Sequence, residues 1–180
     1  LHEAVVLGDG SRRYQQVVRL LVDAGADPLL PTQRDGIRPR SHAQERGYTR
    51  IDAILKEASV GLTANERLLR HAGAGSVVAA EAALADGADL EARDAKGRTA
   101  LLLAATEDRV PMAETLVARG ADVDALDGRH DTPFLVTGVT GSVAMLKALL
   151  PGRPDTTIRN RYGGVAVIPA SERGHAEYVE

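Results

Sequence analysis

The stretch DAKGRTALLLAATEDRVPMAETLVARGADVDA, residues 94–125, contains the signals of a turn followed by two short helices. Thr99 is suited to the N-cap of a first helix over 100–107, because its hydroxyl can accept a backbone N–H of the first helical turn. Pro111 suits the first position of a second helix, where its missing N–H costs nothing. This second helix is expected to run to Gly120, which adopts the left-handed conformation after a helix at low cost. The stretch therefore predicts one complete turn–helix–helix unit.

The same unit returns at a constant interval along the chain. Its exit signal Gly-Ala-Asp stands at 87–89 and again at 120–122, and the Asp alone is kept one interval later at Asp155. The centres of the first helices follow the same interval at His71, Ala104, Thr137 and Ala170. An interval that holds over four units predicts a chain built from stacked repeats.

A 33-residue period with one turn and two helices resembles the ankyrin repeat. The resemblance is carried by Thr99-Ala100-Leu101-Leu102 and Thr132-Pro133-Phe134-Leu135, which stand where the family has Thr-Pro-Leu-His. It implies an all-α ankyrin-repeat solenoid of about six stacked helix-turn-helix units with short turn fingers, both terminal units being incomplete. Low aromatic content, 3%, agrees with a thin core of small aliphatic residues.

We expect one domain, 1–180, whose successive units occupy about 1–32, 33–60, 61–93, 94–126, 127–159 and 160–180. The third unit loses five residues of the period within 59–65, which predicts a shortened finger. The first unit has about five extra residues between its helices, over 9–14. Two interpretations of this insertion stand: a tolerated surface loop, since loop length costs little, or a contact loop that works through Arg12, Arg13 and Tyr14.

The composition excludes several functional classes. A net charge of −3 argues against nucleic acid as the partner, and the absence of cysteine excludes disulfides and thiol catalysis. No apolar run approaches the ~20 residues of a membrane span. We expect a cytoplasmic monomer, with a periplasmic or secreted location as the alternative that the cysteine-free composition also allows.

The chain lacks the sequence motifs of catalysis. Its five histidines include no pair four residues apart, and Gly73-Ala74-Gly75 lacks the third glycine of a dinucleotide-binding loop. No metal and no cofactor is predicted, and the chain is not expected to be an enzyme. His130 stands where the family has a turn glycine, so we expect either a positive φ there or a different turn type.

Function is therefore expected on the concave surface, where the resemblance places fingertips and the exposed sides of the first helices. The predicted partner-binding residues are Arg34, Ile37, Glu45, Arg46, Lys96, Arg98, Thr106, Glu107, Arg129, Asp131, Val139, Thr140, Arg161, Tyr162, Glu172 and Arg173. The prediction is a protein-interaction scaffold, and the alternative is a regulatory or targeting region of a longer enzyme or receptor. The basic fingertips have two interpretations: they keep the chain in solution, or they guide an acidic segment of a partner protein.

Overall fold

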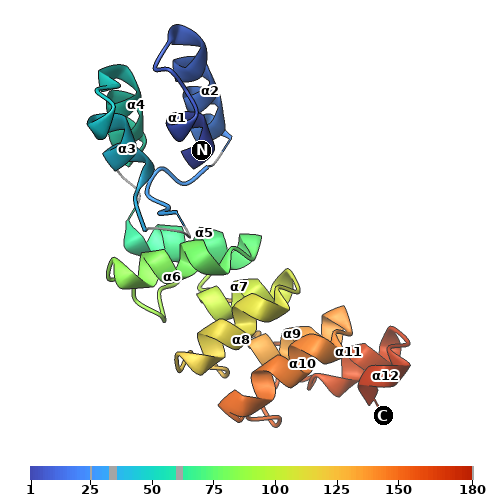
Figure 1. The fold of residues 1–180 in the computed structure, drawn as a ribbon. Coiled ribbons are helices and arrows are strands. Elements are labelled where there is room, and N and C mark those ends of the chain that lie inside the picture. The colour runs from blue at the N-terminus through green and yellow to red at the C-terminus, as the bar shows by residue number, and fades with distance from the viewer. Residues whose placement is uncertain (25, 33–35, 60–62, 180) are drawn as a thin grey trace. The chain divides into compact units, whose positions relative to one another are not determined.

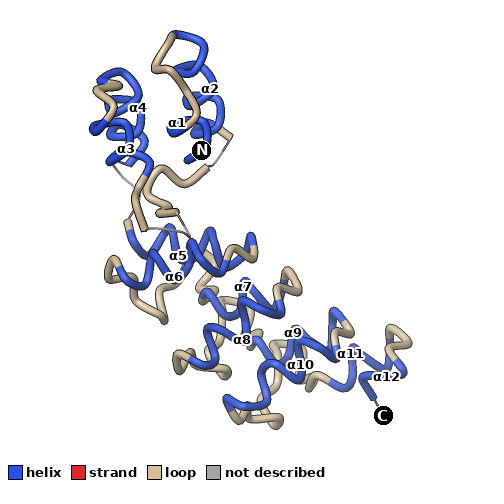
Figure 2. Tube along the Cα trace, in the orientation of Figure 1, coloured by secondary structure: helices blue, strands red, loops and turns tan. Residues whose placement is uncertain are grey.

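The computed structural model describes residues 1–24, 26–32, 36–59 and 63–179 (Figures 1 and 2). Over these ranges the chain forms twelve α-helices, one short 3-10 helix and no strand, which confirms the all-helical prediction. The helices belong to two compact units, Leu1–Thr63 and Ala64–Glu180, which are described in turn.

The first unit contains two helix pairs that pack on each other. Its helices are α1 (His2–Val6), α2 (Arg12–Asp23), α3 (Pro39–Glu45) and α4 (Thr49–Ser59). Helix α1 lies against α3, and α2 lies against α4. Their shared core consists of Val5, Val18, Ala43, Ile51 and Leu55, each at most 1% exposed.

Half of the expected insertion in the first unit, residues 12–14, is helical. Helix α2 begins at Arg12, ahead of the apolar run 17–22 from which the sequence predicts this helix, and Ser11 takes the extended backbone of an N-cap residue. Arg12, Arg13 and Tyr14 all lie in the first turn of α2. The interpretation that places them in a contact loop is therefore wrong. The loop that remains is held where the Tyr48 hydroxyl donates to the Gly8 carbonyl at 2.9 Å.

The second unit contains the regular repeats. Its helices are α5 (Ala64–Ala74), α6 (Val77–Ala85), α7 (Ala100–Thr106), α8 (Val110–Ala118), α9 (Pro133–Thr140), α10 (Val143–Leu149), the 3-10 helix η1 (Leu150–Gly152), α11 (Val167–Glu172) and α12 (Ala176–Val179). The first helices α5, α7, α9 and α11 pack in one row, and α6, α8 and α10 pack in a second row (Figure 1). Buried Leu101, Leu116 and Met145 join a run of buried alanines in the core.

The fourth repeat follows its sequence signals closely. Thr99 caps α7 by accepting the Leu102 N–H at 3.3 Å, and α7 ends one residue before the expected end. Helix α8 begins at Val110, so Pro111 takes the second position rather than the predicted first. Gly120 follows α8 with a φ of 87°.

Backbone positions with positive φ recur with the repeat. The turn position is occupied by Gly97, His130 and Gly163, with φ values of 77°, 63° and 78°. The prediction of a positive φ at His130 is thus confirmed. Among the described residues the other non-glycine cases are Asp108 and Arg153, which also stand where other repeats carry glycine. Each left-handed non-glycine residue costs roughly 1–2 kcal/mol, so the fold imposes this geometry on the sequence.

Candidate functional site

Three fingers of the second unit share one hydrogen-bonding plan. The fingers are residues 94–98 (finger four), 127–131 (finger five) and 160–164 (finger six), each named after its repeat. In each finger the first side chain accepts the backbone N–H groups two and four residues later, at 2.7–3.0 Å: Asp94, Asp127 and Asn160. Asp and Asn favour this arrangement because their short side chains reach their own backbone.

Fingers four and five are joined directly. The Gly128 N–H donates to the Lys96 carbonyl at 2.9 Å. The Arg93 guanidinium donates to the Gly97 carbonyl of finger four and to the Leu126 carbonyl, directly before finger five. A Cβ on Gly128 would lie 3.0 Å from the Lys96 carbonyl oxygen, so any side chain at this position would crowd the contact. These bonds fix the register of the two fingers.

Finger four neutralises its own arginine. The Arg98 guanidinium pairs with Asp94 at 2.7 Å. Burial acts to raise the pKa of Asp94, but hydrogen bonds from the side chain and backbone of Arg98 and from the Lys96 N–H outweigh it, so the pKa is lowered. Asp94 is therefore a stabilising carboxylate, and Arg98 has its charge already matched.

Finger five places a carboxylate where finger four has its arginine. Asp131 stands one repeat interval after Arg98. Finger five therefore has no counterpart of the Arg98–Asp94 ion pair, and Asp131 lies near the like charge of Asp127. The pKa of Asp131 is raised, first by burial and then by the charge of Asp127, with Arg161 and Arg129 acting in the opposite direction. Finger five therefore holds two like charges close together.

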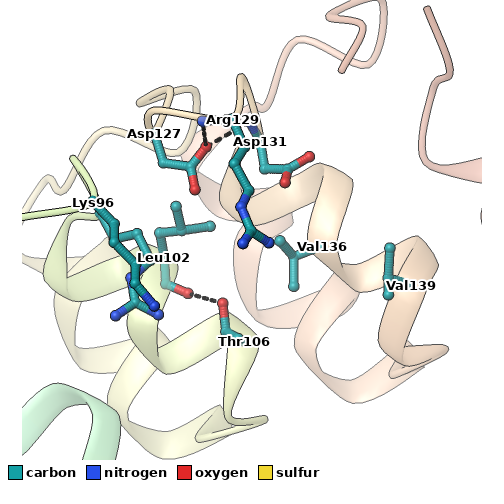
Figure 3. A pocket seen from close by; sticks show the side chains of 9 residues that line it. Lys96, Leu102, Thr106, Asp127, Arg129, Asp131, Val136 and Val139 are labelled. Carbon is teal, nitrogen blue, oxygen red and sulfur yellow. Dashed lines mark hydrogen bonds between the residues drawn. The ribbon is translucent and has the colours of Figure 1, made fainter. Parts of the chain in front are cut away.

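A hollow lies below fingers four and five. It has a volume of about 240 Å³ and is lined by Lys96, Arg98, Leu102, Thr106, Asp127, Arg129, Asp131, Val136 and Val139. Figure 3 shows the Arg129 side chain reaching from its finger down toward the helices, while Val136 and Val139 extend from α9. We call this the first hollow: charged groups form its rim, and Leu102, Val136 and Val139 form its apolar floor.

A second hollow adjoins the first along the same side of the unit. It has a volume of about 650 Å³ and is lined by Arg129, Asp131, Val139, Asn160, Arg161, Tyr162, Gly163, Gly164, Ile168, Pro169, Glu172 and Arg173. Arg129, Asp131 and Val139 line both hollows. On the far rim, Arg161 lies 4.7 Å from the centre of the exposed Tyr162 ring and donates to its hydroxyl.

Four cations on these rims have no salt-bridge partner. Lys96, Arg129, Arg161 and Arg173 form no ion pair within 4.0 Å with any residue that the structure describes. Arg98 differs, because Asp94 neutralises it. The positive charge available to a ligand therefore comes from Lys96 at the first hollow, from Arg161 and Arg173 at the second, and from Arg129 at both.

The hollows bring together ten of the sixteen predicted residues: Lys96, Arg98, Thr106, Arg129, Asp131, Val139, Arg161, Tyr162, Glu172 and Arg173. Glu107 and Thr140 line neither hollow. The others are Ile37, Glu45 and Arg46, which belong to the first unit, and Arg34, which lies outside the described residues.

Sequence reasoning missed the floor and part of the rim. The residues missed in the first hollow are Leu102, Asp127 and Val136. Those missed in the second are Asn160, Gly163, Ile168 and Pro169. The repeat interval carried a usable signal, since Asp127 and Asn160 follow Asp94 at successive steps of one interval.

Two surveys of the described residues gave negative results. No three His, Cys, Asp or Glu side chains of these residues gather closely enough to hold a metal ion. None of the helices in the described part of the chain has the length and apolar character needed to cross a membrane.

Comparison with known proteins agrees with this architecture. The family model described as "Ankyrin repeat" matches residues 96–128, which run from finger four through α7 and α8 into finger five. The chain is 44% identical over 55 residues to the Escherichia coli (strain K12) protein named "Putative ankyrin repeat protein YahD", a match that covers 31% of this chain and 27% of that relative.

The paired helices and projecting fingers define a helical repeat protein, and the sequence matches identify the repeat. Residues 96–128 form an ankyrin repeat, and the chain is similar in sequence to an ankyrin-repeat protein. Repeats of this kind are generally protein–protein interaction modules, whose stacked units present extended binding surfaces. The chain spans about a quarter of the length of the matched relative.

Proposed function

We propose that this chain is a non-catalytic protein-binding module that holds its partner in the two hollows of the second unit. One observation carries the proposal: four cations without salt-bridge partners among the described residues surround an apolar floor that runs across adjoining repeats. Exposed apolar and charged groups placed together in this way are typical of interaction surfaces.

Charge and apolar contact contribute differently to binding. Lys96, Arg129 and Arg161 at the rims attract an acidic segment and raise its association rate, an effect that salt weakens. The floor residues Val136 and Val139 provide apolar surface whose removal from water favours the complex. The rim therefore selects by charge, and the floor supplies affinity.

The fingers are ordered before the partner arrives. Asp94, Asp127 and Asn160 brace their own turns, and the Gly128–Lys96 bond ties finger four to finger five. A surface that is already ordered loses less conformational entropy on binding. This rigidity supports a binding role for the fingers.

Affinity purification from extracts of the source cell tests the proposal. Two of the baits are the unchanged chain and a variant with Lys96→Glu and Arg129→Glu. The matched control carries Arg13→Glu and Lys147→Glu, which make the same change of net charge at exposed positions outside both hollows. Circular dichroism checks that all three proteins fold alike.

The proposal expects proteins that are captured by the unchanged chain and by the control but lost by the Lys96/Arg129 variant. Increasing salt should weaken the same interaction. Partners retained equally by all three proteins would show that binding uses another surface, and the proposal would be wrong.

A further inference from the structure

We infer that the two hollows bind an extended peptide segment with two acidic side chains and an apolar side chain between them. This inference rests on the proposed function and specifies its ligand. It follows from the order of charges along the hollows, from the carboxylate between them and from the spacing of the repeats.

Each hollow has cations of its own, and the part that the two hollows share has one cation and one carboxylate. Lys96 lines only the first hollow, and Arg161 and Arg173 line only the second, beside Glu172. Arg129 and Asp131 line both hollows. One acidic side chain of the ligand therefore fits in each hollow, and the shared middle offers no net charge to a third.

In the shared middle, Asp131 offsets the charge of Arg129, so a third acidic side chain gains no net attraction there. Asp131 is partly buried, and Asp127 already places a like charge near it. A ligand carboxylate at this position would add to the repulsion and lose its hydration. Val136 and Val139, which lie on the same helix below the finger, instead offer contact to an aliphatic or aromatic side chain.

The spacing of the repeats sets the spacing of the acidic residues. Neighbouring packed helices lie roughly 8–10 Å apart. An extended chain rises about 3.3 Å per residue, so acidic residues about three positions apart reach neighbouring fingers. A helical ligand would need a separation of about seven residues for the same distance, at about 1.5 Å per residue. The separation between the acidic residues in the ligand sequence therefore distinguishes an extended ligand from a helical one.

Selection from a library of random twelve-residue peptides displayed on phage, panned on the full chain, tests the inference. Enriched peptides should share two Asp or Glu residues about three apart with a Leu, Ile, Val or Phe between them. A consensus peptide is then synthesised with a fluorescent label, and its Kd is measured for each variant. The Lys96→Glu/Arg129→Glu protein should bind it at least about tenfold more weakly, as removal of two charge-pairing groups predicts, while the Arg13→Glu/Lys147→Glu control should bind it unchanged.

A second variant examines the central position. A peptide whose apolar residue is replaced by Glu should bind the unchanged chain more weakly than the consensus peptide. Asp131→Asn should reduce that difference, because it removes the repelling charge while keeping the shape of the side chain.

The outcomes separate this inference from the proposed function. Enriched neutral or basic peptides that are lost with Lys96→Glu/Arg129→Glu would overturn the inference and leave the binding face in place. Acidic residues seven apart would overturn the extended conformation. Peptides that bind all variants equally would contradict both the inference and the proposed function, and a selection that enriches nothing would overturn the inference.

Discussion

Repeats four and five have the same fold, and three of the corresponding positions at which their residues differ are informative. The turn has Gly97 in repeat four and His130 in repeat five, both with positive φ. The next residue is Arg98, paired with Asp94, in one repeat and Asp131, close to Asp127, in the other. In the first helix, Ala105 of α7 corresponds to Gly138 of α9.

The comparison shows that repeat five has less favourable residues than repeat four in the finger that lines the hollows. Finger four has the residue types that its backbone and charges favour, whereas finger five has a strained histidine and two nearby carboxylates. Such local conflicts are expected at functional sites, where the sequence serves a purpose other than stability. The position of Asp131 in both hollows agrees with that view.

The largest effect is expected from Gly138→Ala, which gives repeat five the residue of repeat four. Gly138 is buried, and a Cβ there would overlap the carbonyl oxygen of Ala166, at the start of α11. Because backbone atoms must move, unfolding in urea should show a loss of about 2–3 kcal/mol. Gly73→Ala is the matched control, since its Cβ would meet nothing within 4 Å, and it should stabilise α5 by about 0.5–1 kcal/mol. Equal behaviour of the two variants would contradict the packing described.

Gly97→Ala should lower the free energy of unfolding, because finger four then loses the glycine that its positive φ favours. The new side chain would be forced into a positive φ and would approach the Gly128 nitrogen at 3.1 Å. We expect a loss of roughly 1–2 kcal/mol in urea unfolding. His130→Ala keeps a Cβ at the matching position, and a nearly unchanged stability is expected. If His130→Ala were as harmful as Gly97→Ala, then the contacts of the histidine would matter more than the backbone strain.

The repeat interval made much of this fold predictable from the sequence. Thr99 and Gly120 identified the limits of a helix pair, and the periodic positions of the fingers followed from them. The start of α2 was missed because the apolar pattern begins only at Val17, although Ser11 is a residue type that favours N-caps. An apolar pattern therefore locates a helix better than it locates its first turn.

The candidate site was less predictable than the fold. Fingertip residues such as Arg129 and Tyr162 were found because the repeat interval marks their positions. The floor residues Leu102 and Val136 were missed because their contribution depends on which part of a nearly buried helix face remains open between fingers. The pairing of Arg98 with Asp94 was also missed, since the sequence shows both charges but not the rotamers that join them.

His130→Gly should raise the free energy of unfolding, by less than Gly97→Ala lowers it. It relieves the left-handed strain of a side chain, but glycine also gains freedom in the unfolded chain, so the net increase in stability should be about 0.5–1 kcal/mol. Urea unfolding measures the change. A destabilised variant would mean that the exposed His130 side chain makes stabilising contacts that outweigh its strain.

The smallest expected effect is on the pH dependence of stability. Removing one carboxylate should raise stability at neutral pH in finger five and lower it in finger four. The pKa of Asp131 is raised above its ordinary value of 3.8, so its ionised form opposes folding at neutral pH. Asp131→Asn should therefore be more stable than the unchanged chain at about pH 7, and this gain should vanish as the pH falls toward and below 3.8. The pKa of Asp94 is lowered, so Asp94→Asn should lose stability at neutral pH, and that loss should shrink on acidification.

Urea unfolding of both variants over a series of pH values checks these signs. A Gln substitution at the exposed Glu114, which lines neither hollow, serves as the control for the removal of one carboxylate. If Asp131→Asn were destabilising at neutral pH, the account of finger five as two carboxylates that repel each other would be wrong.

Site-specific photo-crosslinking in the source cell tests the central claim most directly. A benzoylphenylalanine is placed at position 139, because Val139 lines both hollows and is 39% exposed, and in a second protein at position 147, because Lys147 is exposed on α10 outside them. The account predicts a light-dependent crosslink to a partner protein from position 139 and none from position 147. A crosslink from position 147 with none from position 139 would contradict it.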